Sequence, residues 1–346
     1  MSTNWETAEV LKTPMEICWQ FDYAIDADKL KTLYSKAKRY QWDAERDIDW
    51  ELGVDPSKPV VGPDPMGMFH VPVIKQLSES QQNTLRAHLG AHQLSQIVHG
   101  EQGALMTAAA LTHAVPDYEG KLYAATQTMD EARHVEVFET YIRKLALVYP
   151  MSKTLKALID VTLSADSWVK IAIGMNMVVE GLALGTFHNV LAVTECELLR
   201  SIMQGVIRDE SRHVAFGNLY VGMAIADMHE DDREDVADFA FDAVKMMRES
   251  RRQAVPDGAF LQVLDNCEID RDDFFKSVME LRSSGVKIEM PRDQVHPFKH
   301  LMMPALVRVG AVTDRTRARF DAEGIPVWED KSTLERMERD SPDMLS

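Results

Sequence analysis

The pentapeptide Asp-Glu-x-Arg-His occurs twice in this 346-residue chain, at residues 130–134 and 209–213. In each copy the Glu and the His are three residues apart, which places both side chains on one face of an α-helix, one turn apart. A further glutamate lies thirty residues before each of these, at Glu101 and Glu180. Four helices that each direct a carboxylate inward, two of them adding a His, form the ligand set of a di-iron or di-manganese carboxylate site.

The two thirty-residue intervals are each centred on a predicted turn. The midpoint of the first is Pro116, within a turn predicted at 114–120. The midpoint of the second is Glu195, inside the sequence Thr194–Glu197, which predicts a capping box at the start of a helix. Antiparallel helices of equal length bring residues symmetric about their turn to the same height. The two glutamate pairs should therefore lie level, near the middle of one bundle.

Helical patterns extend over most of the chain after residue 77. Helices are predicted, starting near Ser78 or Ser80, at about 78–113, 118–148 (with Asp117 as its cap), 152–187 with a break near 164–167, 195–227, 231–254, 270–283 and 298–322. Residues 53–73 contain five prolines and predict an extended loop that cannot be helical. No strand pattern of consequence is present. The predicted fold class is all-α, a four-helix bundle with additional flanking helices.

The same pattern divides the chain into parts that pack around a single core. Residues 1–77 should form an N-terminal arm, a short helix and a Pro-rich loop that pack on the bundle. The four-helix di-metal bundle is expected at 78–228, additional helices of the same domain at 229–324, and a polar tail at 325–346. No linker that separates two cores is visible.

The composition predicts a cytoplasmic protein that binds neither nucleic acid nor membrane. The chain has 38 Lys and Arg against 55 Asp and Glu, and the net charge of −17 disfavours nucleic acid and anionic membrane as partners. Its three cysteines are widely spaced and lack a CxxC pair, which favours free thiols in a reducing compartment. No signal peptide is recognisable, and no stretch approaches the uninterrupted apolar length of a membrane span.

Residues beside the repeated Glu and His predict supporting roles. A metal-bound His needs its second ring nitrogen oriented, usually by a carboxylate. Asp130 and Asp209 are placed to do this, either for the His of their own motif or across to the opposite helix. Arg133 and Arg212 are placed to hold those aspartates, with simple surface charge as the alternative. Oxygen and imidazole ligands suit iron or manganese better than zinc or copper.

Apolar residues close to the proposed ligands argue against solvated helix faces, since a carboxylate on an apolar face is costly unless it is paired or binds metal. They also predict a dry pocket that favours small, largely apolar organic substrates. The expected lining comprises Leu105, Phe138, Met177, Leu184 and Phe187. Three nearby residues are candidate polar contacts, with satisfied core groups as the favoured alternative: Gln127, Asn176 and Thr186.

The two Asp-Glu-x-Arg-His motifs, each with its upstream Glu, resemble those of the ferritin-like di-iron carboxylate superfamily. Within it they are similar to the O2-activating branch, which includes bacterial multicomponent monooxygenase hydroxylases and ribonucleotide reductase small subunit-like oxidases. The resemblance covers about residues 80–225, with a weaker patch at 41–50. It implies a ferritin-like four-helix bundle that uses O2 and binds two iron ions, or a manganese–iron pair. The implied ligands are Glu101, Glu131, His134, Glu180, Glu210 and His213.

Five positions depart from the patterns of these relatives. Phe138 stands where the radical-bearing reductases carry a tyrosine. Met175 and Ala104 replace the Tyr and Val of the crosslinking oxidases, and Leu184 replaces a Thr of the monooxygenases. N-oxygenating relatives often have a seventh ligand, a His one turn before the last Glu, where this chain has Val206. These departures disfavour ribonucleotide reduction and crosslinking, and they leave N-oxygenation without a dedicated residue.

We therefore expect an O2-dependent di-iron oxygenase or oxidase that performs hydroxylation or a related oxidation at a Glu4His2 site, with no catalytic residue beyond the metal ligands. The chain lacks a Rossmann motif and a Cys-ligated cluster motif, so a ferredoxin or flavin reductase is expected as external electron donor. A homodimer is also expected. Two alternatives stay open: a non-catalytic or ferroxidase metal-handling protein, and a radical-generating subunit similar to the ribonucleotide reductase small subunit.

Overall fold

The computed structural model describes residues 9–55, 58, 60, 65–252, 258–285 and 295–340, and this part of the chain contains helices and no strand. Its elements are α1 (Asp28–Arg39), η1 (Trp50–Leu52), η2 (Pro65–His70), α2 (Pro72–Lys75), α3 (Glu79–Ala114), α4 (Tyr118–Leu145), α5 (Lys153–Leu163), α6 (Trp168–Ala172), η3 (Ile173–Val179), α7 (Glu180–Val193), α8 (Glu197–Ala226), α9 (Glu230–Arg252), α10 (Gly258–Asn266), α11 (Arg271–Ser283), η4 (Phe298–Met302), α12 (Met303–Val309), α13 (Asp314–Ala322) and α14 (Ser332–Asp340).

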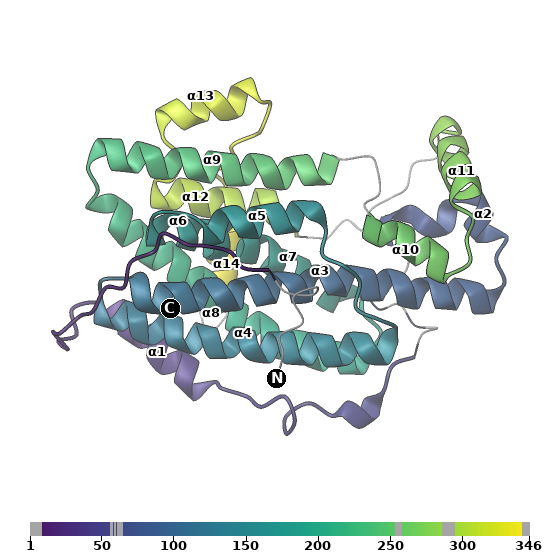
Figure 1. The fold of residues 1–346 in the computed structure, drawn as a ribbon, viewed down its shortest axis with the longest axis horizontal. Coiled ribbons are helices and arrows are strands. Elements are labelled where there is room, and N and C mark those ends of the chain that lie inside the picture. The colour runs from purple at the N-terminus through teal and green to yellow at the C-terminus, as the bar shows by residue number, and fades with distance from the viewer. Residues whose placement is uncertain are drawn as a thin grey trace.

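Four long helical segments form the centre of the molecule: α3, α4, the run of α6, η3 and α7, and α8. The hairpin of α3 and α4 lies along the long axis, with α1 beside α4, while α9, α12 and α13 cover the opposite side (Figure 1). The predicted all-α, ferritin-like four-helix bundle with additional flanking helices is confirmed. The predicted break before the third bundle helix is also found, since α5 ends at Leu163 and α6 begins at Trp168.

The predicted helix start at Ser78 is found, whereas the side chains of Thr194 and Asp117 do not make the capping bonds that were predicted for them. Ser78, one of the two residues at which α3 was predicted to start, caps this helix. It also forms a capping box that was not predicted, because Ser78 Oγ accepts from the Gln81 N–H and Gln81 Oε1 accepts from the Ser78 N–H. The capping box predicted at Thr194–Glu197 is wrong: Thr194 Oγ1 accepts from the Cys196 N–H, and α8 begins at Glu197. Asp117 stands at the N-cap of α4 but its side chain makes no capping bond.

Several peripheral predictions need correction. The single helix predicted at 298–322 is interrupted, because Gly310 adopts the left-handed conformation (φ 84°) and Thr313 caps a new helix. The loop prediction for 53–73 is wrong for η2 and α2, where Pro65 and Pro72 occupy first helical positions that tolerate proline; positions 56–57, 59 and 61–64 lie outside the described residues. Helix α10 was not predicted, and α14 lies in the predicted polar tail, whose residues 341–346 are also undescribed.

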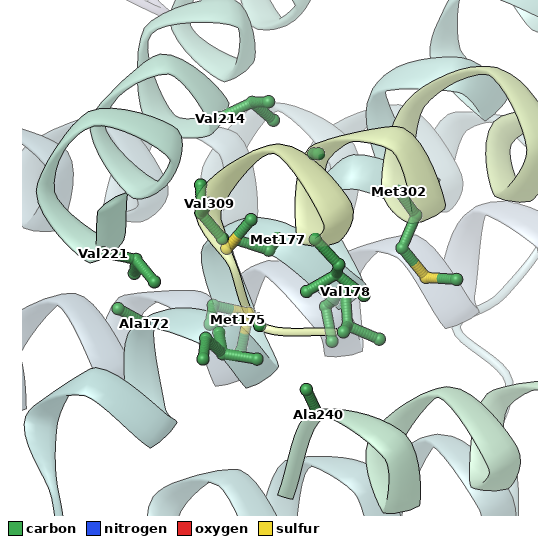
Figure 2. Close-up of a cluster of buried hydrophobic side chains, with 14 of the residues drawn as sticks. Ala172, Met175, Met177, Val178, Val214, Val221, Ala240, Met302 and Val309 are labelled. Carbon is green, nitrogen blue, oxygen red and sulfur yellow. The ribbon is translucent and has the colours of Figure 1, made fainter. Parts of the chain in front are cut away.

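The third bundle helix contains a π-helical segment, η3, directly before Glu180. Figure 2 shows its side chains in the core among residues of α8, α9, η4 and α12: Met175, Met177, Val178, Val214, Val221, Ala240, Met302 and Val309. The run Trp168–Val193 is long and apolar enough to span a membrane, contrary to the sequence prediction, but 89% of its apolar window is buried inside the protein. Burial in the core of the bundle accounts for that composition.

The N-terminal segment is attached to the bundle by specific backbone contacts. The Cys18 N–H donates to the His113 carbonyl, at the end of α3. The buried carboxylate of Glu119 accepts from the N–H groups of Asp26 and Ala27 and so holds the start of α1 against α4. All three cysteines are free, as predicted.

Candidate metal centre

The glutamates and histidines of the repeated pattern meet inside the bundle. They are at most 5% exposed and come from four helices: Glu101 from α3, Glu131 and His134 from α4, Glu180 from α7, and Glu210 and His213 from α8. Their ligand atoms form two groups, within each of which all atoms lie within 4.8 Å of one another: Glu101, Glu131, His134 and Glu210 in one, and Glu131, Glu180 and His213 in the other. Glu131 belongs to both groups, as a carboxylate that bridges two metal ions would.

Both imidazole rings turn their Nδ1 atoms toward the carboxylates. His134 Nδ1 lies 3.2 Å from Glu101 Oε2 and 3.2 Å from Glu210 Oε1. His213 Nδ1 lies 3.0 Å from Glu131 Oε1. The two ring centroids are 5.9 Å apart. The two histidines therefore face a common volume that the glutamates also face.

The Nε2 atoms point to aspartates across the bundle. His134 Nε2 is 3.2 Å from Asp209 Oδ2, and His213 Nε2 is 3.4 Å from Asp130 Oδ2. The Asp of each motif thus contacts the His of the other motif, which decides between the two arrangements that the sequence left open. A carboxylate at Nε2 fixes the ring so that Nδ1 presents a lone pair to a cation.

Two buried arginines connect these aspartates. Arg133 Nη2 lies 2.5 Å from Asp130 Oδ1 and 2.8 Å from Asp209 Oδ2. Arg212 donates to Asp209 and lies 3.5 Å from Asp130 Oδ2. Both arginines are at most 4% exposed, so simple surface charge does not describe them. Each guanidinium joins both motifs, because both of its aspartates serve a histidine of the centre.

Sequence reasoning gave no role to two residues that complete this network. Trp42 Nε1 donates to Asp209 Oδ2 at 2.7 Å, and its ring lies 4.7 Å from the Arg133 guanidinium carbon. Gln41 Nε2 donates to Asp130 Oδ1 at 2.7 Å and Gln41 Oε1 accepts from Arg133. The sequence did contain a sign that Gln41 and Trp42 matter, because the weaker resemblance to the di-iron superfamily at residues 41–50 begins with these two residues. A Cβ at Gly205 would lie 3.0 Å from the Trp42 ring, so glycine leaves room for it.

Two amides hold the carboxylates on the side of α7. Gln127 Nε2 donates to Glu180 Oε1 at 2.8 Å and lies 3.2 Å from Glu131 Oε1. Asn176 Nδ2, in the π-helical segment, donates to Glu180 Oε2 at 3.0 Å. A Cβ at Gly217 would lie 2.6 Å from Asn176 Cβ, so glycine allows α8 to approach η3 closely. Both amides contact proposed ligands.

The electrostatics of the site depend on burial. Burial raises the pKa of Glu101 and of Glu180 well above the ordinary value, and the charge of Glu210 reinforces both shifts. Burial alone would lower the pKa of His134 and His213, but the surrounding carboxylates raise both instead. The metal-free site therefore holds protons on groups that would otherwise be ligands.

The donor set fits a pair of divalent cations. Four glutamates and two aspartates face two guanidinium groups, so four negative charges remain when the imidazoles are neutral. Two divalent ions supply the matching charge, and oxygen and imidazole donors suit iron or manganese. Four buried polar atoms at the centre lack a well-oriented hydrogen bond, and three of them have only a histidine or glutamate of the same centre within 3.0–3.3 Å: Glu131 Oε2, Glu210 Oε1, Glu210 Oε2 and His213 Nδ1. Buried polar atoms without partners are costly, and metal coordination would satisfy all four.

The residues predicted to line a substrate pocket do not gather in one place. Phe138 and Phe187 stack on each other with centroids 5.9 Å apart in one hydrophobic cluster, whereas Met177 and Leu184 belong to the other. Leu105 is only partly buried. The Thr186 hydroxyl donates to the Leu182 carbonyl as a satisfied core group, and Val206 is fully buried among apolar side chains.

The sequence and structure of this chain were compared with protein families, solved structures and curated proteins. The model of a family described as p-aminobenzoate N-oxygenase AurF matches residues 25–274. Solved structures that it resembles include an R2-like ligand-binding oxidase with an aerobically reconstituted Mn/Fe cofactor (20% identity, TM-score 0.45, 76% of this chain and 93% of that chain). A point mutant of an R2-like ligand-binding oxidase with an anaerobically reconstituted Mn/Fe cofactor is also similar to this chain. The two have 18% identity and a TM-score of 0.47, over 85% of this chain and 95% of that chain. No curated protein matches.

Proposed function

The chain belongs to the p-aminobenzoate N-oxygenase AurF family, and from this premise we propose that it is an O2-dependent di-metal oxygenase of a small, largely apolar organic substrate. The observation that carries the proposal is the pair of buried carboxylate–histidine groups that share Glu131. A purely structural role would bury four carboxyl groups together that must be neutralised by bound protons and charged imidazoles, which is costly compared with an apolar core.

Two iron ions, or a manganese–iron pair, would be held by the six ligands Glu101, Glu131, His134, Glu180, Glu210 and His213. When bound, such a pair supplies the activation of dioxygen and the oxidation of the substrate, chemistry that no side chain of the protein provides. Under this proposal no further catalytic residue is needed.

The protein's own residues would bind the metal ions, orient the ligand side chains and exclude water from the site. Asp209 and Asp130 keep the proton of each imidazole on Nε2 and leave Nδ1 free to coordinate. Arg133 and Arg212 balance the charge of these aspartates, so the four glutamates remain to neutralise the metals. The protons held by the metal-free site must leave as the cations enter.

The substrate is proposed to be a small aromatic compound, and arylamines are the first class to test because the family is named for an arylamine. Four side chains that lie within seven residues of a proposed ligand in the sequence are buried in two apolar clusters: Phe138 and Phe187 in one, and Met177 and Leu184 in the other. Such surface favours an apolar ring over a charged metabolite. Val206 provides no seventh nitrogen ligand, so carbon hydroxylation is tested alongside N-oxygenation. We also propose a cytoplasmic homodimer that takes its electrons from a ferredoxin or flavin reductase.

The test begins with anaerobic loading with Fe(II) and measurement of bound metal, expected at about two ions per chain. The loaded protein is then mixed with isotopically labelled O2 and a panel of arylamines and unsubstituted aromatics, and products are examined for label by mass spectrometry. Glu131→Ala should lose metal and product, whereas Glu136→Ala, an exposed glutamate on the same helix, should lose neither. The proposal is wrong if Glu131→Ala retains both ions.

A further inference from the structure

A line of stacked aromatic rings leads from the metal centre toward the surface. Phe216 follows His213 by one helical turn on α8, and its ring lies 4.4 Å from that of Tyr123 and 5.3 Å from that of Tyr220. Tyr220 stacks in turn on Trp168 of α6, with centroids 4.5 Å apart and planes inclined by 28°. Tyr220 is 2% exposed and Trp168 only partly buried. Tyr220 lies seven residues from His213, roughly 10 Å along the helix axis.

Tyr220 also has a proton acceptor. Its hydroxyl donates to Asp117 Oδ2, and the Asp117 N–H lies 3.4 Å from the same hydroxyl oxygen. Asp117 occupies the N-cap of α4 but does not cap it, so its carboxylate is directed to Tyr220 instead. The local structure is shaped for this ring, because a Cβ at Gly120 would lie 2.8 Å from the Tyr220 oxygen.

Tyr123 provides an internal contrast. Its ring is fully buried at the inner end of the stack, yet its hydroxyl makes no hydrogen bond. A phenol loses a proton when it loses an electron, and without an acceptor the charged product would remain in an apolar environment. Burial raises the pKa of Tyr220, and the Asp117 hydrogen bond raises it further, so the phenol keeps its proton until it is oxidised. Of these two tyrosines, Tyr220 is the one built for reversible one-electron oxidation.

We propose that Trp168, Tyr220 and Phe216 form a relay that discharges the oxidised metal centre when no substrate is bound. The inference rests on the proposed function, which supplies the oxidant: metal ions oxidised by dioxygen. Tyr220 gives one electron to the centre past Phe216 and one proton to the Asp117 carboxylate, and becomes a neutral tyrosyl radical. Trp168 then gives an electron to Tyr220, which regains its proton from Asp117. A soluble one-electron reductant of the ascorbate or thiol class restores Trp168 at the surface.

The relay would protect the protein from its own oxidant. Met177, Phe138 and Phe187 are buried apolar side chains within seven residues of a proposed ligand in the sequence, and an oxidising equivalent that finds no substrate would attack such side chains. An electron drawn from the surface removes that equivalent without a covalent change to the chain. The relay therefore determines how often the protein survives contact with O2 in the absence of substrate.

The test uses Fe(II)-loaded full-length protein mixed with O2 without substrate or added reductant, freeze-quenched and examined by electron paramagnetic resonance. The wild-type protein should give a tyrosyl radical whose signal narrows when its tyrosines are ring-deuterated. Tyr220→Phe, which keeps the stacked ring, should lose the signal, and Asp117→Asn should lose it too. In Trp168→Phe the radical should form but decay more slowly. Tyr149→Phe, a fully buried hydrogen-bonded tyrosine outside the stack, is the matched control and should match the wild type.

A second readout is covalent damage. After repeated exposure to O2, mass spectrometry should find more oxidised Met177 and hydroxylated phenylalanine in Tyr220→Phe than in the wild type or Tyr149→Phe. Metal content and the circular dichroism spectrum, measured on each variant, show that the site and fold are retained. If the wild type binds no metal or consumes no O2, the proposed function fails and the relay with it. If the wild type consumes O2 but Tyr220→Phe gives the same radical and the same damage, the relay alone is refuted.

Discussion

Replacement of Trp42 by phenylalanine tests whether the segment before the bundle tunes the metal centre. The indole N–H donates to Asp209 Oδ2 at 2.7 Å, and Asp209 in turn contacts His134. Phenylalanine keeps an aromatic ring beside Arg133 but removes this donor. A hydrogen bond to a buried charged group contributes about 1.5–3 kcal/mol. Because Arg133 still contacts the same oxygen at 2.8 Å, we expect the free energy of unfolding to fall by an amount near the lower end of this range.

The larger effect should be on metal binding. A hydrogen bond behind a metal-ligating His typically changes affinity by roughly 10- to 100-fold when it is lost. Trp50→Phe is the matched control, because Trp50 is also partly buried but its indole N–H donates to the backbone carbonyl of Ala44 and not to an aspartate. It should cost about 1 kcal/mol of stability and leave metal affinity unchanged.

The assay pairs denaturant unfolding of the metal-free proteins with chelator competition for Fe(II) and Mn(II). Trp42→Phe should show weaker binding of both ions than the wild type, and Trp50→Phe should not. Equal metal affinity in the two variants would refute the reasoning, since it would mean that Asp209 orients His134 without help from Trp42.

Three further predictions follow from single features. Glu101, Glu180, His134 and His213 bind protons more tightly in the folded metal-free chain, because their pKa values are raised there. The stability that this proton binding contributes is fully present below about pH 4.5 for the two glutamates and below about pH 6.5 for the two histidines, and it is lost as the pH rises through the raised pKa values. The melting temperature of metal-free protein should therefore fall with rising pH more steeply than that of loaded protein, and parallel curves would contradict this. Gly217→Ala should destabilise by about 1–3 kcal/mol in denaturant unfolding through its clash with Asn176, whereas Gly100→Ala, with nothing within 4 Å, should stabilise by about 0.5–1 kcal/mol; a stabilised Gly217→Ala would mean that α8 can shift. Thr313→Ala should cost about 1 kcal/mol by removing the cap of α13, and no change in unfolding would show that the helix does not depend on it.

The sequence predicted the bundle and its centre because both follow from local periodicity. The i, i+3 spacing of Glu131 and His134 needs only helical geometry, and symmetry about Pro116 and a second turn placed the other glutamates level. The helix start at Ser78 is equally local and was found at one of the two expected residues. These features do not depend on how distant segments meet.

Features that depend on distant contacts were not predictable in the same way. Which aspartate serves which histidine depends on the relative rotation of α4 and α8, and spacing within one helix carries no information on it. Thr194 fits the sequence pattern of a capping box, yet the N-cap of α8 is Cys196, two residues later. Asp117 fits the sequence pattern of an N-cap, yet its carboxylate accepts a hydrogen bond from the hydroxyl of Tyr220, more than a hundred residues away in the sequence. A distant contact replaced the local preference at Asp117, and a local bond to the Cys196 N–H replaced it at Thr194.

The π-helical segment η3 has a consequence for how this sequence tolerates changes of length. An i to i+5 hydrogen-bond pattern accommodates one residue more than an α-helix of the same rise. Deletion of a single residue between Ile173 and Val179 would therefore let the segment close into an ordinary α-helix with every backbone group still paired. The same deletion within the regular α-helix α7 would instead rotate the residues on its two sides by roughly 100° relative to each other, the angle of one residue. At this buried point, loss of one residue would leave α6 and Glu180 in their present relative orientation, so Glu180 would still face the other glutamates.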